Sequence, residues 1–109
     1  MLDLNTISLS APRTMSASQL ELSTPYPNPA RAGARLVLGL AARAQVDVIV
    51  FDAAGRRIRI VAHGTLESGR HELVWNARDE RGARASAGVY FVRASDGSAT
   101  RIQRLVIAD

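Results

Sequence analysis

Pro25-Tyr26-Pro27-Asn28-Pro29-Ala30 decides where the folded part begins, because three prolines alternate with other residues directly before the first strongly apolar strand, 36–40. Each proline fixes φ and lacks an amide hydrogen, so neither a helix nor a central strand can run through this segment. We therefore interpret the segment as a rigid, extended lead-in. The chain after it is organised as short strands separated by turns.

The length of 109 residues fits one domain. The apolar fraction of 47% is typical of a globular protein. The chain contains no cysteine, which excludes disulfides and thiolate metal sites but leaves the cellular compartment open. Residues 1–18 are rich in Ser, Thr and Ala without a sustained period, so we expect a linker or disordered lead before a folded domain at 19–109.

The first residues lack the pattern of a secretory signal, in which a basic start precedes an apolar run. No stretch approaches the roughly 18 apolar residues of a membrane span. The simplest interpretation is that the chain is the end of a longer protein.

All 14 positively charged side chains are arginine, and the net charge is +4. This bias fits a GC-rich genome better than a polyanion-binding surface. The arginines are scattered, and no row of aromatic residues accompanies them, so we expect no nucleic-acid partner.

Alternating apolar residues predict half-buried strands from residue 20 onward. In the strand that follows residue 55, Ile58 and Ile60 are expected on one side, and the extra Val61 suggests a bulge. In the last strand, Ile102 and Val106 share one face and Leu105 and Ile107 the other, so the pattern leaves the inward face ambiguous. Of the two, we expect Leu105 and Ile107 to point inward. The residues expected to be largely buried are Leu36, Leu38, Leu40, Val46, Val48, Val50, Ile58, Leu73, Trp75, Tyr90 and Val92.

Turn signals separate these strands at intervals typical of a β-sandwich. Turns are predicted at residues 52–55 and 79–82, a loop at 64–69, and a hairpin at Asp96-Gly97. Six or seven short strands so spaced predict an all-β fold, an immunoglobulin-like antiparallel β-sandwich. Tyr90 stands where such sandwiches place a corner tyrosine that bonds upstream backbone, and Trp75 is the expected centre of the core.

The residues that could carry chemistry do not form a recognisable site, so we expect no enzyme, no metal and no cofactor. Neither His63 nor His71 has a carboxylate or serine at a spacing that suggests a catalytic triad. Asp47, Asp52, Asp79 and Glu80 do not alternate within a loop as calcium ligands do. Asp52 and Asp79 are better explained as turn formers, whose side chains bond local amides.

Six short motifs in order resemble a known family. They are Pro27-Asn28-Pro29-Ala30, Val46-x-Val48-x-Val50-Phe51-Asp52-x-x-Gly55-Arg56, Gly69-x-His71-x-Leu73-x-Trp75-Asn76, Asp79-x-x-Gly82, Ser86-x-Gly88-Val89-Tyr90-Phe91 and Arg104-Leu105-Val106. Over residues 26–107 the chain resembles the C-terminal (type A) sorting domains of the bacterial type IX secretion system and the immunoglobulin-like domain of the flagellar hook-capping protein. Asn76-Ala77 replaces the family's usual Asp-Gly, and Arg104 stands where lysine is common.

The resemblance implies a non-enzymatic domain that directs a passenger protein to secretion and cell-surface attachment, outside a bacterial cell. Its partners would be the secretion machinery or the passenger. It places export recognition in the last strands, at Arg104, Leu105 and Val106, and we expect this strand to be a sheet edge with backbone groups free to pair. The alternative is a structural module that packs on its own passenger or a partner. The family-motif residues with a structural role are Pro27, Asn28, Pro29, Asp52, Gly55, Trp75, Asp79, Gly82, Gly88 and Tyr90.

Overall fold

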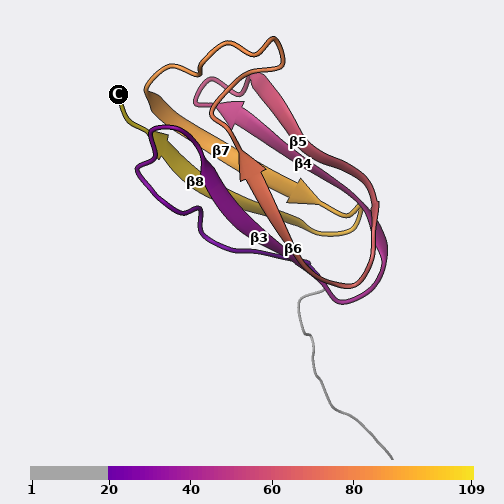
Figure 1. Cartoon of the computed structure of the whole chain (residues 1–109). Helices are drawn as coiled ribbons and strands as arrows, with labels where there is room; N and C mark the ends of the chain where they lie inside the picture. The colour runs from indigo at the N-terminus through magenta and orange to yellow at the C-terminus, as the bar shows by residue number, and fades with distance from the viewer. Residues whose placement is uncertain (1–19) are drawn as a thin grey trace, which may run out of the picture.

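The computed structural model describes residues 20–109 as seven strands in two antiparallel sheets (Figure 1). The three-stranded sheet has the order β2-β3-β6, and the four-stranded sheet has the order β5-β4-β7-β8. The strands are β2 Leu20–Leu22, β3 Ala34–Leu40, β4 Ala44–Asp52, β5 Arg57–Leu66, β6 Gly69–Trp75, β7 Gly88–Ser95 and β8 Thr100–Ile107. The expected immunoglobulin-like antiparallel sandwich is confirmed. The lead expected at 1–18 lies outside the described residues.

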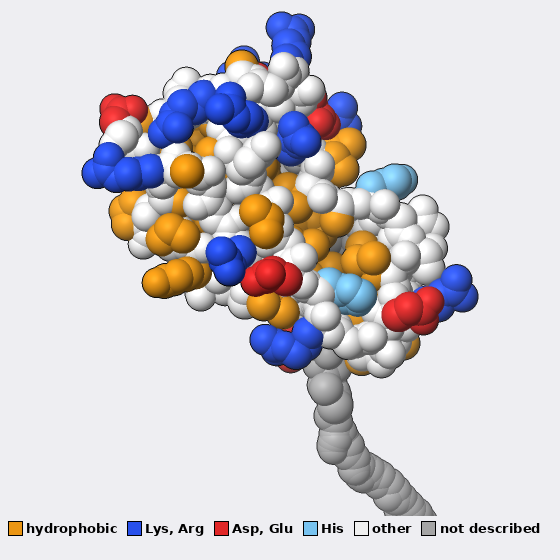
Figure 2. Space-filling view, in the orientation of Figure 1, with side chains coloured by type: hydrophobic (Ala, Val, Ile, Leu, Met, Phe, Trp, Pro, Cys, Tyr) orange, Lys and Arg blue, Asp and Glu red, His pale blue; other side chains and the backbone are white. Residues whose placement is uncertain are grey.

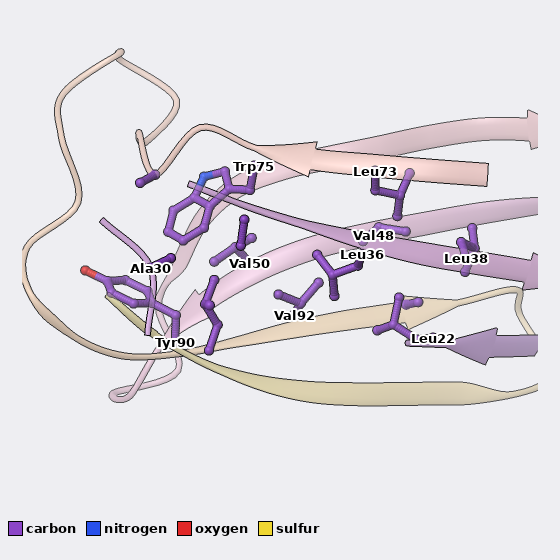
Figure 3. Close-up of a cluster of buried hydrophobic side chains, with 14 of the residues drawn as sticks. Leu22, Ala30, Leu36, Leu38, Val48, Val50, Leu73, Trp75, Tyr90 and Val92 are labelled. Atoms are coloured by element: carbon purple, nitrogen blue, oxygen red, sulfur yellow. The ribbon is translucent and has the colours of Figure 1, made fainter. Parts of the chain in front are cut away.

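The core lies between the inner faces of the two sheets, where apolar side chains from every second strand position meet (Figure 3). All the residues expected in the core are buried except Ile58, and Leu105 and Ile107 also point inward as expected. No polar or charged side chain is buried among residues 20–109. Within the same residues, no helix is long and apolar enough to cross a membrane.

The expected bulge at Val61 is present, because Ile60 and Ala62 pair with successive residues of β4 and leave Val61 unopposed. A second register shift in β5 leaves Ile58 unopposed as well. Each bulge interrupts the alternation of faces. As a result Ile58, Val61 and Ala62 pack partly against the core, whereas Ile60 points outward and is 37% exposed. The expectations that Ile58 is largely buried and shares its face with Ile60 are therefore wrong.

The loop expected at residues 64–69 is mostly strand. β5 continues to Leu66 because β4 reaches back to Ala44 and supplies pairing partners for residues 64–66. β6 then begins at Gly69, so only residues 67–68 connect the two strands. This short connection carries the chain from the four-stranded sheet to the three-stranded sheet (Figure 1).

Trp75 and Tyr90 pack against each other across the two sheets, with ring centroids 5.4 Å apart and ring planes inclined by 59°. The Trp75 indole Nε1–H donates a hydrogen bond to the carbonyl of Arg78 (2.9 Å), and the Tyr90 hydroxyl donates to the carbonyl of Ser86 (2.6 Å). The second bond confirms the expected tyrosine corner. Each end of the loop at residues 76–87 is thus hydrogen-bonded to a buried aromatic side chain, Trp75 at one end and Tyr90 at the other.

Gly33 allows the chain to pass directly beside the Trp75 backbone. Its φ is +136°, which L-residues with a side chain rarely adopt, and a Cβ atom there would lie 2.3 Å from the Trp75 carbonyl oxygen. Gly39, in the middle of β3, has ordinary space at its Cβ position, with the nearest atom of Glu21 at 3.6 Å. Only the first of these two glycines is therefore required by sterics.

We expect Trp75→Ala to lower the free energy of unfolding by about 3–5 kcal/mol, because a large buried side chain is lost and a cavity remains. Val74→Ala is the control, since the Val74 side chain is 63% exposed. Denaturant titration of both variants measures the difference. An unchanged midpoint for Trp75→Ala would contradict the central role of this side chain.

We expect Gly33→Ala to destabilise the domain by more than about 2 kcal/mol, because backbone strain and a steric clash act together. Gly39→Ala should change the free energy of unfolding by no more than about 1 kcal/mol, since Ala is not worse than Gly in a strand interior. Thermal unfolding of the two variants provides the comparison. Equal stability of both would show that the backbone at Gly33 relaxes freely.

Candidate recognition site on the terminal strand

β8 is the outermost strand of the four-stranded sheet and pairs along its whole length with β7. The three candidate recognition residues do not share a face of this strand. The Leu105 side chain is fully buried in the core, the Arg104 side chain is exposed, and Val106 is half-buried on the outer side. Direct contact with a partner is therefore open to Arg104 and Val106, whereas Leu105 holds the strand in place.

The outer edge of β8 is covered by the proline-rich segment. The side chain of Asn28 makes the two hydrogen bonds that the backbone of a neighbouring strand would make. Its Oδ1 accepts from the Val106 amide (3.0 Å), and its Nδ2 donates to the Arg104 carbonyl (3.1 Å). The main chain of Ala30 continues the pairing, with its amide bonded to the Val106 carbonyl (2.9 Å) and its carbonyl bonded to the Ala108 amide (2.7 Å). The expectation of free backbone groups is therefore wrong for the end of this strand.

The proline-rich segment also bridges the two sheets. Tyr26 exchanges two backbone hydrogen bonds of 2.9 Å with Arg35 at the start of β3, while Ala30 bonds to β8. Ala30 is buried beside Trp75 and Tyr90 (Figure 3). Both the Tyr26–Pro27 and the Asn28–Pro29 peptide bonds are cis. The segment is thus an integral wall of the sandwich rather than a lead-in to it.

The remaining part of the β8 edge is less covered. Gln103 donates its side-chain amide to the Leu22 carbonyl (2.8 Å), which links β8 to β2 of the other sheet. Within residues 20–109, no strand lies beyond β8 at Ile102, whose side chain is 58% exposed. Among these residues, the edge of β8 is thus covered more completely at Val106 than at Ile102.

Arginine side chains gather at the end of the molecule that carries the C-terminus and the loop between β6 and β7 (Figure 2). Several of them bond main-chain oxygens rather than side-chain carboxylates. Arg84 donates to the Arg31 carbonyl (2.8 Å), Arg78 donates to the Gly82 carbonyl (2.8 Å), and Arg31 donates to Asp109. These bonds hold the loops while most of the positive charge stays exposed.

The aspartates of the family motifs, Asp52 and Asp79, accept hydrogen bonds from the backbone amides of their own turns. Asp52 Oδ1 accepts from the amides of Arg56 (2.8 Å) and Ala54 (3.0 Å), and the Arg56 amide is the main reason that the pKa of Asp52 is lowered. Asp79 Oδ1 accepts from the amides of Arg81 and Ala83 in the same manner. Within residues 20–109, no three His, Cys, Asp or Glu side chains are grouped as a metal site.

The fold brings a carboxylate to His63 that sequence spacing did not reveal. Asp47 and His63 pair across β4 and β5, and Asp47 Oδ1 contacts His63 Nδ1. On its other side, Asp47 pairs with Ser95 of β7. The carboxylate lies between the imidazole and the serine, so the histidine is not placed to take the serine proton as a triad requires. His71 bonds the carbonyl of Glu67 through Nε2 (2.7 Å).

A family model described as the FlgD Ig-like domain matches residues 28–100. The chain belongs to this family. No curated protein matches the chain in a sequence comparison. Among solved structures, this FlgD Ig-like domain is similar to part of PorZ from Porphyromonas gingivalis, described as an essential bacterial surface component of the type IX secretion system. The match has 29% identity and a TM-score of 0.57, over 86% of this chain and 12% of PorZ.

A second match is to dimeric latent PorU from the same organism, with 16% identity and a TM-score of 0.58. It covers 84% of this chain and 10% of PorU, and at this identity it supports the fold alone. The FlgD Ig-like domain thus spans about a tenth of each of these two proteins. The resemblance to this family of immunoglobulin-like domains is therefore confirmed.

We expect Asn28→Ala to free the end of β8, because the variant loses both side-chain hydrogen bonds to Arg104 and Val106. The loss should be about 1–3 kcal/mol in unfolding free energy, since each bond contributes about 1 kcal/mol. Hydrogen exchange followed by NMR should show faster exchange of the Val106 amide. The Leu105 amide, on the side of β8 that pairs with β7, is the internal control. Unchanged exchange at Val106 would contradict the covering role of Asn28.

Proposed function

We propose that this FlgD Ig-like domain is a non-enzymatic sorting and anchoring tail that directs a passenger protein to secretion and attachment at the bacterial cell surface. The main support is the similarity to PorZ, with 29% identity over 86% of the chain. PorZ is described as a surface component of the type IX secretion system. Because the chain corresponds to only 12% of PorZ, a role as one module of a larger exported protein is consistent with the match.

Arg104 is the side chain best placed for recognition by the export machinery. It is exposed on the outer side of β8, its carbonyl accepts a hydrogen bond from Asn28, and β8 is held in register by β7. Asn28, Pro29, Arg104 and Val106 line a shallow groove of about 330 Å³. An exposed guanidinium on a rigid edge offers a partner a fixed donor at little cost in conformational entropy.

The proposal assigns no catalysis to the domain. The carboxylates of Asp52 and Asp79 accept hydrogen bonds from turn amides, and the order of His63, Asp47 and Ser95 does not suit nucleophilic catalysis.

The second candidate function is a structural module that packs on its passenger. It is favoured by the exposed Ile60 and Ile102 side chains, which a neighbouring domain could cover.

The test is secretion of a reporter fused ahead of the full chain in a bacterium that has type IX machinery. We expect Arg104→Ala to abolish most secretion while the melting temperature of the domain hardly changes, because an exposed charge contributes less than about 1 kcal/mol. Arg70→Ala is the matched control, since Arg70 is an exposed arginine on β6 of the other sheet. Secretion of the control should equal that of the wild type.

Normal secretion of Arg104→Ala would count against direct recognition of this side chain. A different outcome is that the reporter stays inside the cell even when it is fused to the unaltered chain. The structural module then becomes the better explanation. Loss of secretion by both arginine variants would indicate a general effect of charge instead of a site on β8.

A further inference from the structure

The outer face of the four-stranded sheet carries an apolar band where a solvent-facing sheet surface is normally polar. The pairing registers place Ile60, Ile49, Arg93 and Ile102 side by side in one row across the strands. Ile60 and Ile102 at the two ends of the row are 37% and 58% exposed. None of these side chains reaches the core between the sheets.

A hollow of about 420 Å³ lies in this band. Its floor and walls are the side chains of Phe51, Phe91, Arg93 and Ile102, and the turn at residues 52–55 closes one end. The two phenylalanines pair directly across β4 and β7. The lining of the hollow is therefore mostly apolar, which suits an aliphatic or aromatic side chain.

Positive charge surrounds the hollow. The guanidinium carbon of Arg93 lies 4.6 Å from the centroid of the Phe51 ring, a cation–π arrangement, and within residues 20–109 no carboxylate forms an ion pair with it. Arg57 pairs with Phe51, and Arg104 pairs with Phe91, so arginines stand at both ends of the phenylalanine row. A second copy of the chain would bring arginines against arginines, which disfavours self-association through this face.

The carboxylates near the hollow are already engaged. Asp52 lines it, but its oxygens accept hydrogen bonds from the turn amides and from the Arg56 side chain (3.1 Å). Asp47, farther along β4, contacts His63. Arg93 therefore keeps its donors available for a carboxylate supplied from outside.

We propose that this hollow is a docking site for an acidic, apolar peptide segment of another protein. One apolar side chain of the segment would enter between Phe51, Phe91 and Ile102. Flanking carboxylates would bind Arg93 and Arg104, with the charge-assisted bidentate geometry that guanidinium groups provide. The hollow lies next to the Asn28-covered edge and shares Arg104 with it. Binding in the hollow goes beyond the proposed sorting function, because it operates whether or not the domain directs export.

The probe is a blocked Glu-Glu-Leu-Glu-Glu peptide added to the isotope-labelled full chain at about 1 mM, where weak binding is detectable. Blocked peptides with Ala in place of Leu, and with Lys in place of Glu, serve as comparisons. We expect NMR shift changes to cluster at Phe51, Phe91, Arg93 and Ile102, with affinity at least about tenfold lower for either comparison peptide.

Two substitutions test the site itself. Arg93→Glu should lower the affinity for the acidic peptide at least about tenfold and allow the Lys peptide to bind. Ile102→Ser should weaken binding, whereas Val74→Ser, a change of an exposed side chain on the other sheet, should not. Circular dichroism of each variant checks that the fold is kept. The proposal is overturned if the acidic peptide produces no shifts, produces them elsewhere, or binds Arg93→Glu as well as the wild type.

Discussion

The contact between Trp75 and Tyr90 is the interaction on which the rest of the structure depends. It joins the end of β6 in one sheet to the start of β7 in the other, and the hydrogen bonds of the two rings fasten both ends of the loop at 76–87. The main chain of Trp75 also dictates a glycine at position 33, because no Cβ fits beside the Trp75 carbonyl. Ala30, buried beside the rings, then places the proline-rich segment against β8. One aromatic pair thus organises one whole end of the sandwich.

A second constraint comes from the sheet edges, whose unpaired backbone groups would otherwise invite association with other chains. The domain covers two of them with its own loops. Asn28 and Ala30 cover the end of β8, and Glu80 covers the bulged part of β5 by bonding the Ile58 carbonyl (3.1 Å) and the Ile60 amide (3.2 Å). At these covered edges, recognition by arginine and apolar side chains is better suited than strand addition.

The departure from the family pattern at residues 76–77 has a structural consequence. Ala77 has a φ of 60°, in the region where glycine is favoured, and its side chain is buried. An L-residue pays roughly 1–2 kcal/mol for this conformation. The fastening of the loop by Trp75 and Tyr90 explains how the strained backbone is held, since the neighbouring contacts determine its course. Arg104, the other departure, keeps a positive charge at an exposed position.

The sequence by itself determined the features that depend on local patterns. Alternation of apolar residues identified the inward faces of β3, β4 and β7, because this signal operates within a few residues. In β8 both faces carry apolar residues, so alternation alone did not decide its inward face. Turn residues such as Asp52, Asp79 and Asp96 marked the reversals. The six ordered motifs were enough to indicate the family. Sequence spacing also suggested the bulge at Val61, where the alternation is locally broken.

Only the tertiary structure decided what covers the candidate site and what remains open. The bonds from Asn28 to β8 join residues 76 and 78 positions apart, the pairing of Asp47 with His63 depends on strand order, and the hollow at Phe51 and Phe91 depends on register. The second bulge at Ile58 likewise follows from the path of β4. Such contacts form between segments that are distant in the chain, so no local period encodes them. Their geometry is decided by the order and register of the strands and by the packing of the proline-rich segment against β8.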